Sequence, residues 1–355
     1  MARWTATIPE YSRPDVNRAG NVLISKSASQ EEIDKALIII NNWRASHYTP
    51  LNTFQKRLRT TANKINTESL IAQRIKRLAS IKLKLERYSD MKLSQIQDIG
   101  GCRAIMKNVS EVDRLVDIYL NHSSGLKHEL SKPQDYIANP KTSGYRGVHL
   151  IYKYRSDKTS NFDDLKIEIQ IRTLIQHAWA TAVETVGTFI GQSLKSSQGE
   201  EDWLLFFTLM SSAMAISEGK PTVPNTPDNL NDLIPEIIRL EKKLGVEGHL
   251  NAFRNSMTIL ADQSHTKDAH YYLLELDPDE RRVIIKSYTQ TQLPTASLDY
   301  LTIEKRIKDG NRNAVLVSAD SVEALKLAYP NYYLDTELFL QEFTRLIGTR
   351  QLSLF

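Results

Sequence analysis

The segment KIEIQIRT, residues 166–173, alternates apolar and polar side chains along its whole length. Successive side chains of a β-strand leave opposite faces, so the isoleucines point to one side and the polar residues to the other. An amphipathic strand at a protein surface shows the same alternation. A carboxylate, an amide and a guanidinium in one row also make a polar floor for a ligand. The segment therefore predicts a strand with one candidate binding face, made of Glu168, Gln170 and Arg172.

Further strands and helices are predicted on both sides of this segment. Apolar and β-branched runs indicate strands at 100–107, 147–155 and 313–319, and a hairpin over 271–288. Apolar spacing of three to four residues indicates helices at 30–47, 51–66, 68–87 and 174–188. Helices are also expected within 201–262, around a loop at 220–229, and at 295–308, 320–328 and 335–346. This mixture predicts an α+β fold, with helices flanking a mixed sheet.

The chain is long enough for more than one domain, since it has 355 residues. Its pattern changes near residue 265, where helical spacing gives way to β-rich runs. We therefore expect an N-terminal domain over 1–200, a helical connecting region over 201–265, and a small α+β domain over 266–355.

Composition excludes several classes of protein. Cys102 is the single cysteine, so neither an internal disulfide nor a cysteine-based zinc site can form. The N-terminus MARWTATIPE has no apolar signal-peptide core, and the longest aliphatic run, residues 36–40, is too short to cross a bilayer. We expect a cytoplasmic protein that does not bind a membrane.

Positive charge is concentrated in one part of the chain. Residues 56–92 contain eleven Lys and Arg against three acidic residues, whereas the net charge of the whole chain is only +4. Such a stretch is typical of proteins that bind phosphate or nucleic acid, although a solvated helix face has the same composition. Both interpretations stay open on charge alone.

Two glycine-containing segments carry further polar side chains. QDIGGCRAIM, residues 97–106, places Asp98 and Arg103 around two glycines, where an Asp can also simply close a turn. KTSGYRGVHL, residues 141–150, places Tyr145 between glycines and near Lys141, Arg146 and His149. A tyrosine on such a loop can stack on a base, which contributes about 1–3 kcal/mol.

Four segments in order resemble the synthetase domain of the RelA/SpoT proteins. They are RIKRLASIKLKL (74–85), QDIGGCRAIM, YIANPKTSGYRGVHL (136–150) and EIQIRT (168–173), within roughly residues 40–190. The resemblance implies a nucleotidyltransferase-like mixed sheet. It also implies an ATP-dependent pyrophosphotransferase, an enzyme that moves pyrophosphate from ATP to a 3′-hydroxyl group.

The resemblance also implies roles for individual residues. Asp98 and Glu168 would be catalytic and would bind Mg²⁺, with Glu168 as the general base near the acceptor hydroxyl. Tyr145 would stack on the acceptor base, with Lys141, His149 and Gln170 lining the same pocket. The ATP-binding set, placed on the predicted helix at 68–87 and the strand that follows it, would be Arg74, Lys76, Arg77, Ser80, Lys84 and Arg103.

Two acceptors are compatible with this chemistry. One is the 3′ end of tRNA, whose pyrophosphorylation blocks translation; the other is GDP or GTP, which yields the alarmone (p)ppGpp. The segments DIGGCR (98–103), YSRPDVNRAG (11–20) and QHAWATA (176–182) look more like the toxic small synthetases, and the basic stretch suits a large polyanion, so tRNA is our first expectation. A catalytically inactive nucleotide-binding module is the third alternative, and the intact Asp98 and Glu168 speak against it.

The 90 residues after position 265 resemble the C-terminal part of the fused toxin–antitoxin proteins called CapRel. In that family a module similar to a zinc finger without its metal holds the synthetase closed until a phage structural protein, such as a capsid protein, binds in antiphage defence. Tyr329 and Tyr332 match a Tyr-x-x-Tyr element of this family, although tyrosines commonly pack in a core. The resemblance implies that this pair is autoinhibitory and occupies the adenine pocket, stacked on Arg74 or Arg77.

Overall fold

A computed structural model describes residues 7–121, 127–131, 133–157, 160–189, 201–256, 258–261, 269–277, 280, 282–307, 312–319, 322–330 and 336–352. Its strands are β1 (Leu70–Ile75), β2 (Gly100–Met106), β3 (Glu129–Leu130), β4 (Gln134–Asp135), β5 (Val148–Lys153), β6 (Lys166–Thr173), β7 (Thr258–Ala261), β8 (Ala269–Asp277), β9 (Arg282–Thr289) and β10 (Asn313–Ser318). The predicted strands at 100–107, 147–155, 166–173 and 313–319 and the hairpin over 271–288 are therefore confirmed.

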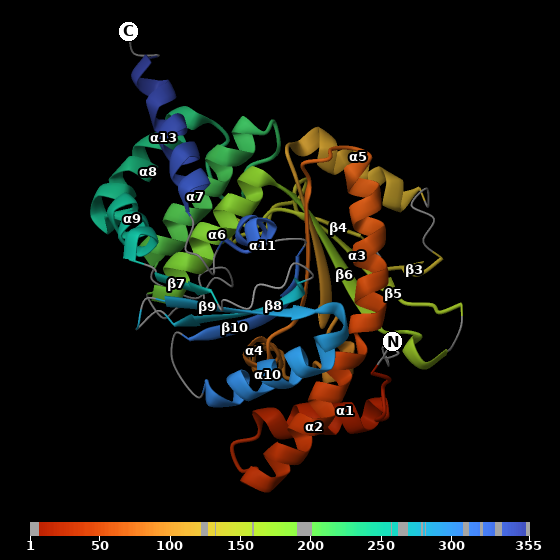
Figure 1. Cartoon of the computed structure of the whole chain (residues 1–355). Coiled ribbons are helices and arrows are strands. Elements are labelled where there is room, and N and C mark those ends of the chain that lie inside the picture. The colour runs from red at the N-terminus through yellow and green to blue at the C-terminus, as the bar shows by residue number, and fades with distance from the viewer. Residues whose placement is uncertain are drawn as a thin grey trace.

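These strands form one mixed sheet, in the order β3-β5-β6-β2-β1-β10-β8-β9-β7, with β4 beside β5. The pairs β2–β6 and β7–β9 are parallel, and the other pairs are antiparallel. Helices lie on both sides of the sheet (Figure 1). The predicted α+β class, with helices flanking a mixed sheet, is confirmed.

The helices fall into groups around this sheet. α1 (Arg13–Ile24), α2 (Gln30–Ser46), α4 (Leu78–Arg87) and α10 (Leu293–Arg306) lie in the lower part of Figure 1, and α3 (Tyr48–Asn63) runs along the sheet. α5 (Val109–Leu120) lies above. The group at the upper left comprises α6 (Leu174–Phe189), α7 (Glu201–Ser217), α8 (Leu230–Leu244), α9 (Val246–Ser256) and α13 (Glu337–Leu352), with α11 (Val322–Ala328) beside α6.

The predicted helix over 68–87 is wrong in its first half. Residues 70–75 form β1, which pairs with β2 on one side and with β10 on the other, and only the second half is helical, as α4. A short apolar run does not distinguish a helix from a strand. The decision comes from two partner strands, one of which begins more than two hundred residues later in the chain.

The strands after residue 265 belong to the same sheet as the strands before it. Gln73 and Arg74 of β1 pair with Ser318 and Val317 of β10. One hydrophobic core also contains residues from both parts, such as Leu51 of α3 and Tyr271 of β8. The division at residue 265 stays a prediction, but the two parts share a sheet and a core.

A second core joins the helices at the upper left of Figure 1. Phe206 and Phe207 of α7 pack against Phe339 of α13, with ring centroids 6.5 and 5.8 Å apart. This core also contains Trp179 of α6 and Tyr145 from the loop before β5. The final helix therefore packs against helices that support this loop. Among the described helices, none is long and apolar enough to cross a bilayer.

Candidate active site

Strands β1, β2 and β6 lie side by side and place polar side chains on one face. Arg74 of β1 is opposite Gly101 of β2, which is opposite Glu168 of β6, and Arg103 is opposite Gln170. Because side chains alternate along each strand, the predicted polar face of β6 meets the arginines of its neighbours. This face is buried, since Glu168 is 7% exposed and Arg172 is 2% exposed. The pattern belongs to a covered site, not to a solvent-facing strand.

Asp98, which precedes β2, is bound by two lysines. Lys76 Nζ lies 2.6 Å from its Oδ2 and Lys84 Nζ lies 2.9 Å from its Oδ1. Burial raises the pKa of Asp98, but the two ammonium groups outweigh this effect and hold the pKa well below its usual range. Asp98 is therefore a partly buried, ionised carboxylate just before β2.

Glu168 is held by two different donors. His149 Nδ1 lies 2.9 Å from its Oε1, and Gln170 Nε2 donates to its Oε2 at 2.6 Å. Burial and nearby Asp98 raise the pKa of Glu168, whereas the contacts with His149 and Gln170 lower it, and the net direction is downward. The two carboxylates are thus charged groups of the same sign, kept ionised by separate partners.

This arrangement predicts a loss of stability in acid. A lowered pKa in the folded state contributes stability above the unfolded pKa, and this stability disappears as the pH falls through the folded pKa. The unfolded values are about 4 for both groups. As the pH is lowered below about 4, we expect the free energy of unfolding to decrease less in Asp98→Asn than in the parent protein. Urea unfolding between pH 3 and 7 checks this, and identical pH profiles would contradict it.

A small cavity of about 30 Å³ lies between these groups. It is lined by Ala72, Arg74, Lys76, Asp98, Gly101, Cys102, Arg103, Glu168, Gln170 and Tyr329. This volume admits about one or two water molecules and no nucleotide. The structure therefore brings both predicted catalytic residues together with three predicted ATP-binding residues, Arg74, Lys76 and Arg103.

The remaining ATP-binding predictions are placed differently. Lys84 of α4 reaches the site through Asp98. Arg77 precedes α4 and donates from Nη1 to Asn313 Oδ1 at the start of β10, and Ser80 lies in the first turn of α4; neither lines the cavity. The prediction that one helix carries this set is wrong, because Arg74 lies on β1 and Lys76 directly follows it.

The predicted acceptor residues lie near Glu168, and one of them, Gln170, also lines the cavity. The Tyr145 hydroxyl is 2.6 Å from His149 Nε2, whose other ring nitrogen contacts Glu168. Tyr145 is only 6% exposed, and burial raises its pKa to about 12. Lys141 Nζ lies 5.4 Å from the centre of the Tyr145 ring. Lys141, Tyr145, His149 and Gln170 thus form one connected group beside Glu168.

Tyr136 was missed by the sequence analysis. Its ring lies 4.1 Å from Lys141 Nζ, and it meets the Tyr145 and His149 rings edge to face, with centroids 6.0 and 5.3 Å apart. Tyr136 is also more exposed than Tyr145. It stands first in the quoted segment YIANPKTSGYRGVHL, and its aromatic side chain was the available signal.

Tyr329 lines the cavity from the C-terminal part of the chain. It is 2% exposed, its hydroxyl donates to the Gln73 carbonyl at 2.9 Å, and the Arg103 guanidinium lies 5.9 Å from its ring centre. Arg103 Nη1 also donates to the Ala328 carbonyl at 3.4 Å. Of the two arginines predicted to stack on this ring, Arg74 lines the same cavity as Tyr329, whereas Arg77 is not among the residues that line it. Tyr332 lies outside the described residues.

The donor groups of the site bear on whether it can hold a metal ion. Among the described residues, no cluster of three or more His, Cys, Asp or Glu side chains can hold a metal ion. Two carboxylates suit Mg²⁺, which commonly takes one or two carboxylates together with substrate phosphates. Here Lys76, Lys84, His149 and Gln170 contact the four carboxylate oxygens. The donor chemistry fits Mg²⁺ provided that substrate phosphates draw the lysines away from Asp98.

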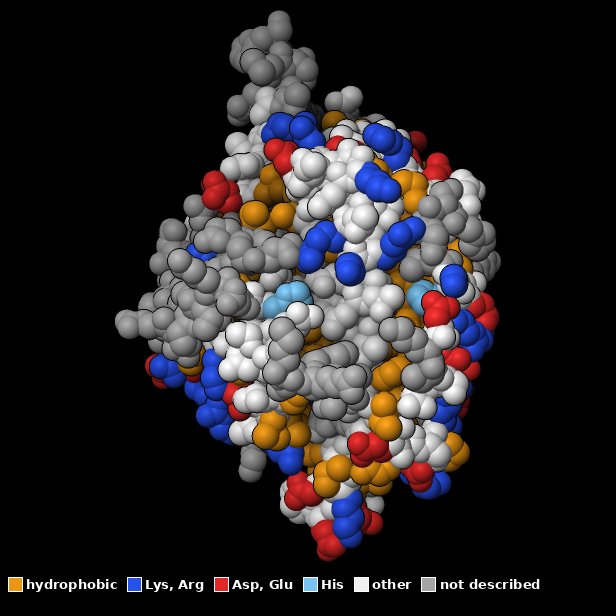
Figure 2. All heavy atoms as spheres, turned by 45° about the vertical axis from the view of Figure 1, so that its right-hand side comes forward, with side chains coloured by type: hydrophobic (Ala, Val, Ile, Leu, Met, Phe, Trp, Pro, Cys, Tyr) orange, Lys and Arg blue, Asp and Glu red, His pale blue; other side chains and the backbone are white. Residues whose placement is uncertain are grey.

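The basic stretch at 56–92 is divided among α3, β1 and α4 and does not form one helical stripe. Lys56, Lys64 and Lys92 are exposed, whereas Lys76 and Lys84 pair with Asp98. The space-filling view shows several Lys and Arg side chains near the centre and upper part of one face (Figure 2). Positive charge therefore serves both the site and the surface.

The part of the chain that carries Arg74, Asp98, Arg103 and Glu168 is similar in sequence to known proteins. Residues 73–186 match the family model described as the region found in RelA/SpoT proteins. The chain is 35% identical over 114 residues to GTP pyrophosphokinase YwaC of Bacillus subtilis and 33% identical over 113 residues to GTP pyrophosphokinase YjbM of the same organism. These matches cover 30% and 31% of this chain and 52% of each relative, so the chain spans about half the length of these curated relatives.

Solved structures similar to this chain include two alarmone synthetases of Bacillus subtilis. Small alarmone synthetase 1, bound to its product pppGpp, has a TM-score of 0.42 and 25% identity, over 50% of this chain and 93% of that one. Small alarmone synthetase 2 has a TM-score of 0.38 and 21% identity, over 61% and 99%. Residues 73–186 therefore match the region found in RelA/SpoT proteins, and this part of the chain is similar in sequence to proteins named GTP pyrophosphokinases.

Proposed function

We propose that the protein transfers pyrophosphate from ATP to the 3′-hydroxyl group of an acceptor. The observation that carries the proposal is the meeting of two carboxylates, buried Glu168 and partly buried Asp98, with Arg74, Lys76 and Arg103 around one cavity. Phosphoryl-type transfer depends on positioning and on neutralising phosphate charge, and this group offers both signs of charge. The match of residues 73–186 to the RelA/SpoT region supports the same reaction.

Each side chain has a distinct task in this proposal. The acceptor oxygen attacks the β-phosphorus of ATP, the bond from that phosphorus to the oxygen bridging the α-phosphate breaks, and AMP leaves. Glu168 accepts the proton of the acceptor hydroxyl, and its contact with His149 orients the receiving oxygen. When ATP binds, Lys76 and Lys84 release Asp98 and bind phosphate oxygens instead. Mg²⁺, held by Asp98 and Glu168, would supply charge neutralisation on the phosphates.

We further propose that the described arrangement is autoinhibited. Tyr329 occupies the space beside Arg74 and Arg103, and the cavity that remains is too small for a nucleotide. A ring tethered in the same chain competes at an effective concentration in the millimolar range. An activator must prefer the open state in order to release it. The resemblance to CapRel suggests a phage structural protein, such as a capsid protein, bound by residues 266–355 in antiphage defence.

The acceptor is tested directly by labelling. We expect radioactive label from γ-³²P-ATP to appear on the 3′ end of tRNA when an activated variant is incubated with tRNA, GDP and GTP. The exposed positive charge favours a polyanion, whereas the names of the relatives favour a guanine nucleotide. Label on GDP or GTP alone would assign the (p)ppGpp alternative. No label on any acceptor would reject the transferase.

A further inference from the structure

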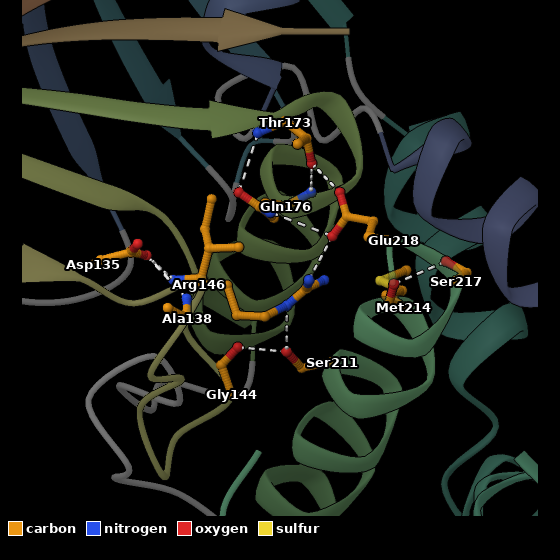
Figure 3. A network of polar contacts seen from close by, with 11 residues as sticks. Asp135, Ala138, Gly144, Arg146, Thr173, Gln176, Ser211, Met214, Ser217 and Glu218 are labelled. Atoms are coloured by element: carbon orange, nitrogen blue, oxygen red, sulfur yellow. Dashed lines mark hydrogen bonds and ion pairs between the residues drawn. The ribbon is translucent and has the colours of Figure 1, made fainter. Parts of the chain in front are cut away.

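A buried ion pair joins the loop that carries Tyr145 to helix α7 (Figure 3). Arg146 Nη1 donates to Glu218 Oε2, just beyond the end of α7, and the two side chains are 1% and 6% exposed. Burial lowers the pKa of Arg146, and the carboxylate of Glu218 opposes this effect. A buried charge is tolerated only with a partner, so this contact ties the loop to α7.

Glu218 also binds the start of α6. Its Oε1 accepts a hydrogen bond from Thr173 Oγ1 at 2.5 Å, and its Oε2 accepts one from Gln176 Nε2 at 3.3 Å. Thr173 is the last residue of β6, the strand that carries Glu168. One carboxylate therefore connects the end of the catalytic strand to the loop.

Ser211 of α7 makes a second connection to the same loop. Its hydroxyl donates to the Gly144 carbonyl at 2.6 Å and accepts from Arg146 Nε at 3.2 Å (Figure 3). Gly144 has φ of +85°, and a Cβ there would lie 2.8 Å from Trp179 Cζ2 and 3.1 Å from the Ser211 Cβ. Only glycine allows the loop backbone to approach α6 and α7 this closely.

We infer that Glu218 and Ser211 are positioning residues for the acceptor, which makes α7 part of the catalytic unit. The inference rests on the proposed function. Both residues lie outside the 73–186 segment that matches the RelA/SpoT region. Arg146 directly follows Tyr145, whose hydroxyl contacts His149 and through it Glu168. We call the contacts of Glu218 and Ser211 with this loop the anchor. Loss of the anchor displaces this chain of contacts, while the ATP-binding residues on β1 and α4 keep their partners.

The test compares the Michaelis constants of variants that also carry Tyr329→Ala. The acceptor substrate is tRNA or GDP, whichever of the two accepts label. We expect Ser211→Ala and Glu218→Ala to raise KM for the acceptor by about tenfold or more and to leave KM for ATP unchanged. Glu218→Gln, which keeps an accepting oxygen, is expected to recover part of the loss. Glu236→Ala, which removes an exposed ion pair with Arg239 on α8, is the matched control.

Hydrogen exchange of the 141–147 amides in the parent background gives a readout without activity. Faster exchange in Glu218→Gln and Ser211→Ala, but not in Glu236→Ala, is the expected result. An unchanged acceptor KM in active Ser211→Ala and Glu218→Gln overturns the inference and leaves the proposed function intact. If no variant transfers label, the proposed function fails, and unchanged exchange then also rejects the anchor.

Discussion

Replacing Glu168 with alanine is expected to lower the rate of pyrophosphate transfer by about 10³-fold, because the substitution removes the proposed base. Asp98→Ala is expected to have a similar effect, since Lys76 and Lys84 lose the carboxylate that orients them and the proposed metal loses a ligand. The measurement is label transfer from γ-³²P-ATP in the Tyr329→Ala background.

Suitable controls separate catalysis from folding. Glu168→Gln keeps the shape of the side chain and an oxygen that accepts from His149, and should be as inactive as Glu168→Ala. Glu129→Ala removes an exposed carboxylate that pairs with Lys153 and Arg155, and should remain active. Circular dichroism and thermal unfolding establish that each variant is folded. Folded Glu168→Ala and Asp98→Ala proteins with full activity would refute the assignment of the site.

Replacing Tyr329 and Tyr332 with alanine is expected to make the protein toxic without any activator. Loss of the Tyr329 ring enlarges the cavity that this ring lines beside Arg103. If about 99% of the parent molecules are in the closed state, loss of that state raises the apparent ATP affinity about a hundredfold. Equilibrium binding of ATP and growth of expressing cells measure the two effects. Adding Glu168→Ala to the same protein should restore growth.

Two single variants resolve what the tyrosine contributes. Tyr329→Phe loses the hydroxyl that donates to the Gln73 carbonyl but keeps the ring, and should stay closed for the most part. Tyr288→Ala loses a ring that is 3% exposed on β9, away from the cavity, and should not change ATP affinity. If the double-tyrosine variant is folded, harmless and no better at binding ATP than the parent, autoinhibition by this segment is rejected.

The sequence predicted the strands well where local pattern and final environment agree. The alternation of KIEIQIRT, the apolar run after Gly101 and the hairpin over 271–288 all became strands of the sheet. Each is long enough, or patterned enough, for its period to show. The prediction of one helix over 68–87 was wrong in its first half, because the apolar residues there are compatible with the period of a helix and with that of a strand.

The chemical groups of the site were likewise visible in the sequence, but their partners were not. Asp98 and Glu168 were predicted as a catalytic pair, and the structure places both at one cavity. That Lys76 and Lys84 neutralise Asp98, while His149 and Gln170 hold Glu168, depends on strand register and on the approach of α4. Glu218 carries no local signal at all, since its importance arises from burial beside Arg146.

The sequence by itself determined the secondary structure of most strands and the kinds of side chain available for chemistry, because both depend on neighbouring residues. Tertiary structure alone decided that β10 pairs with β1, that Tyr329 lies against Arg103, and that α7 holds the loop of Tyr145. These contacts join residues far apart in the chain. Their free energy comes from burying apolar rings and pairing charges across elements. The local periodicity of the sequence does not predict such contacts.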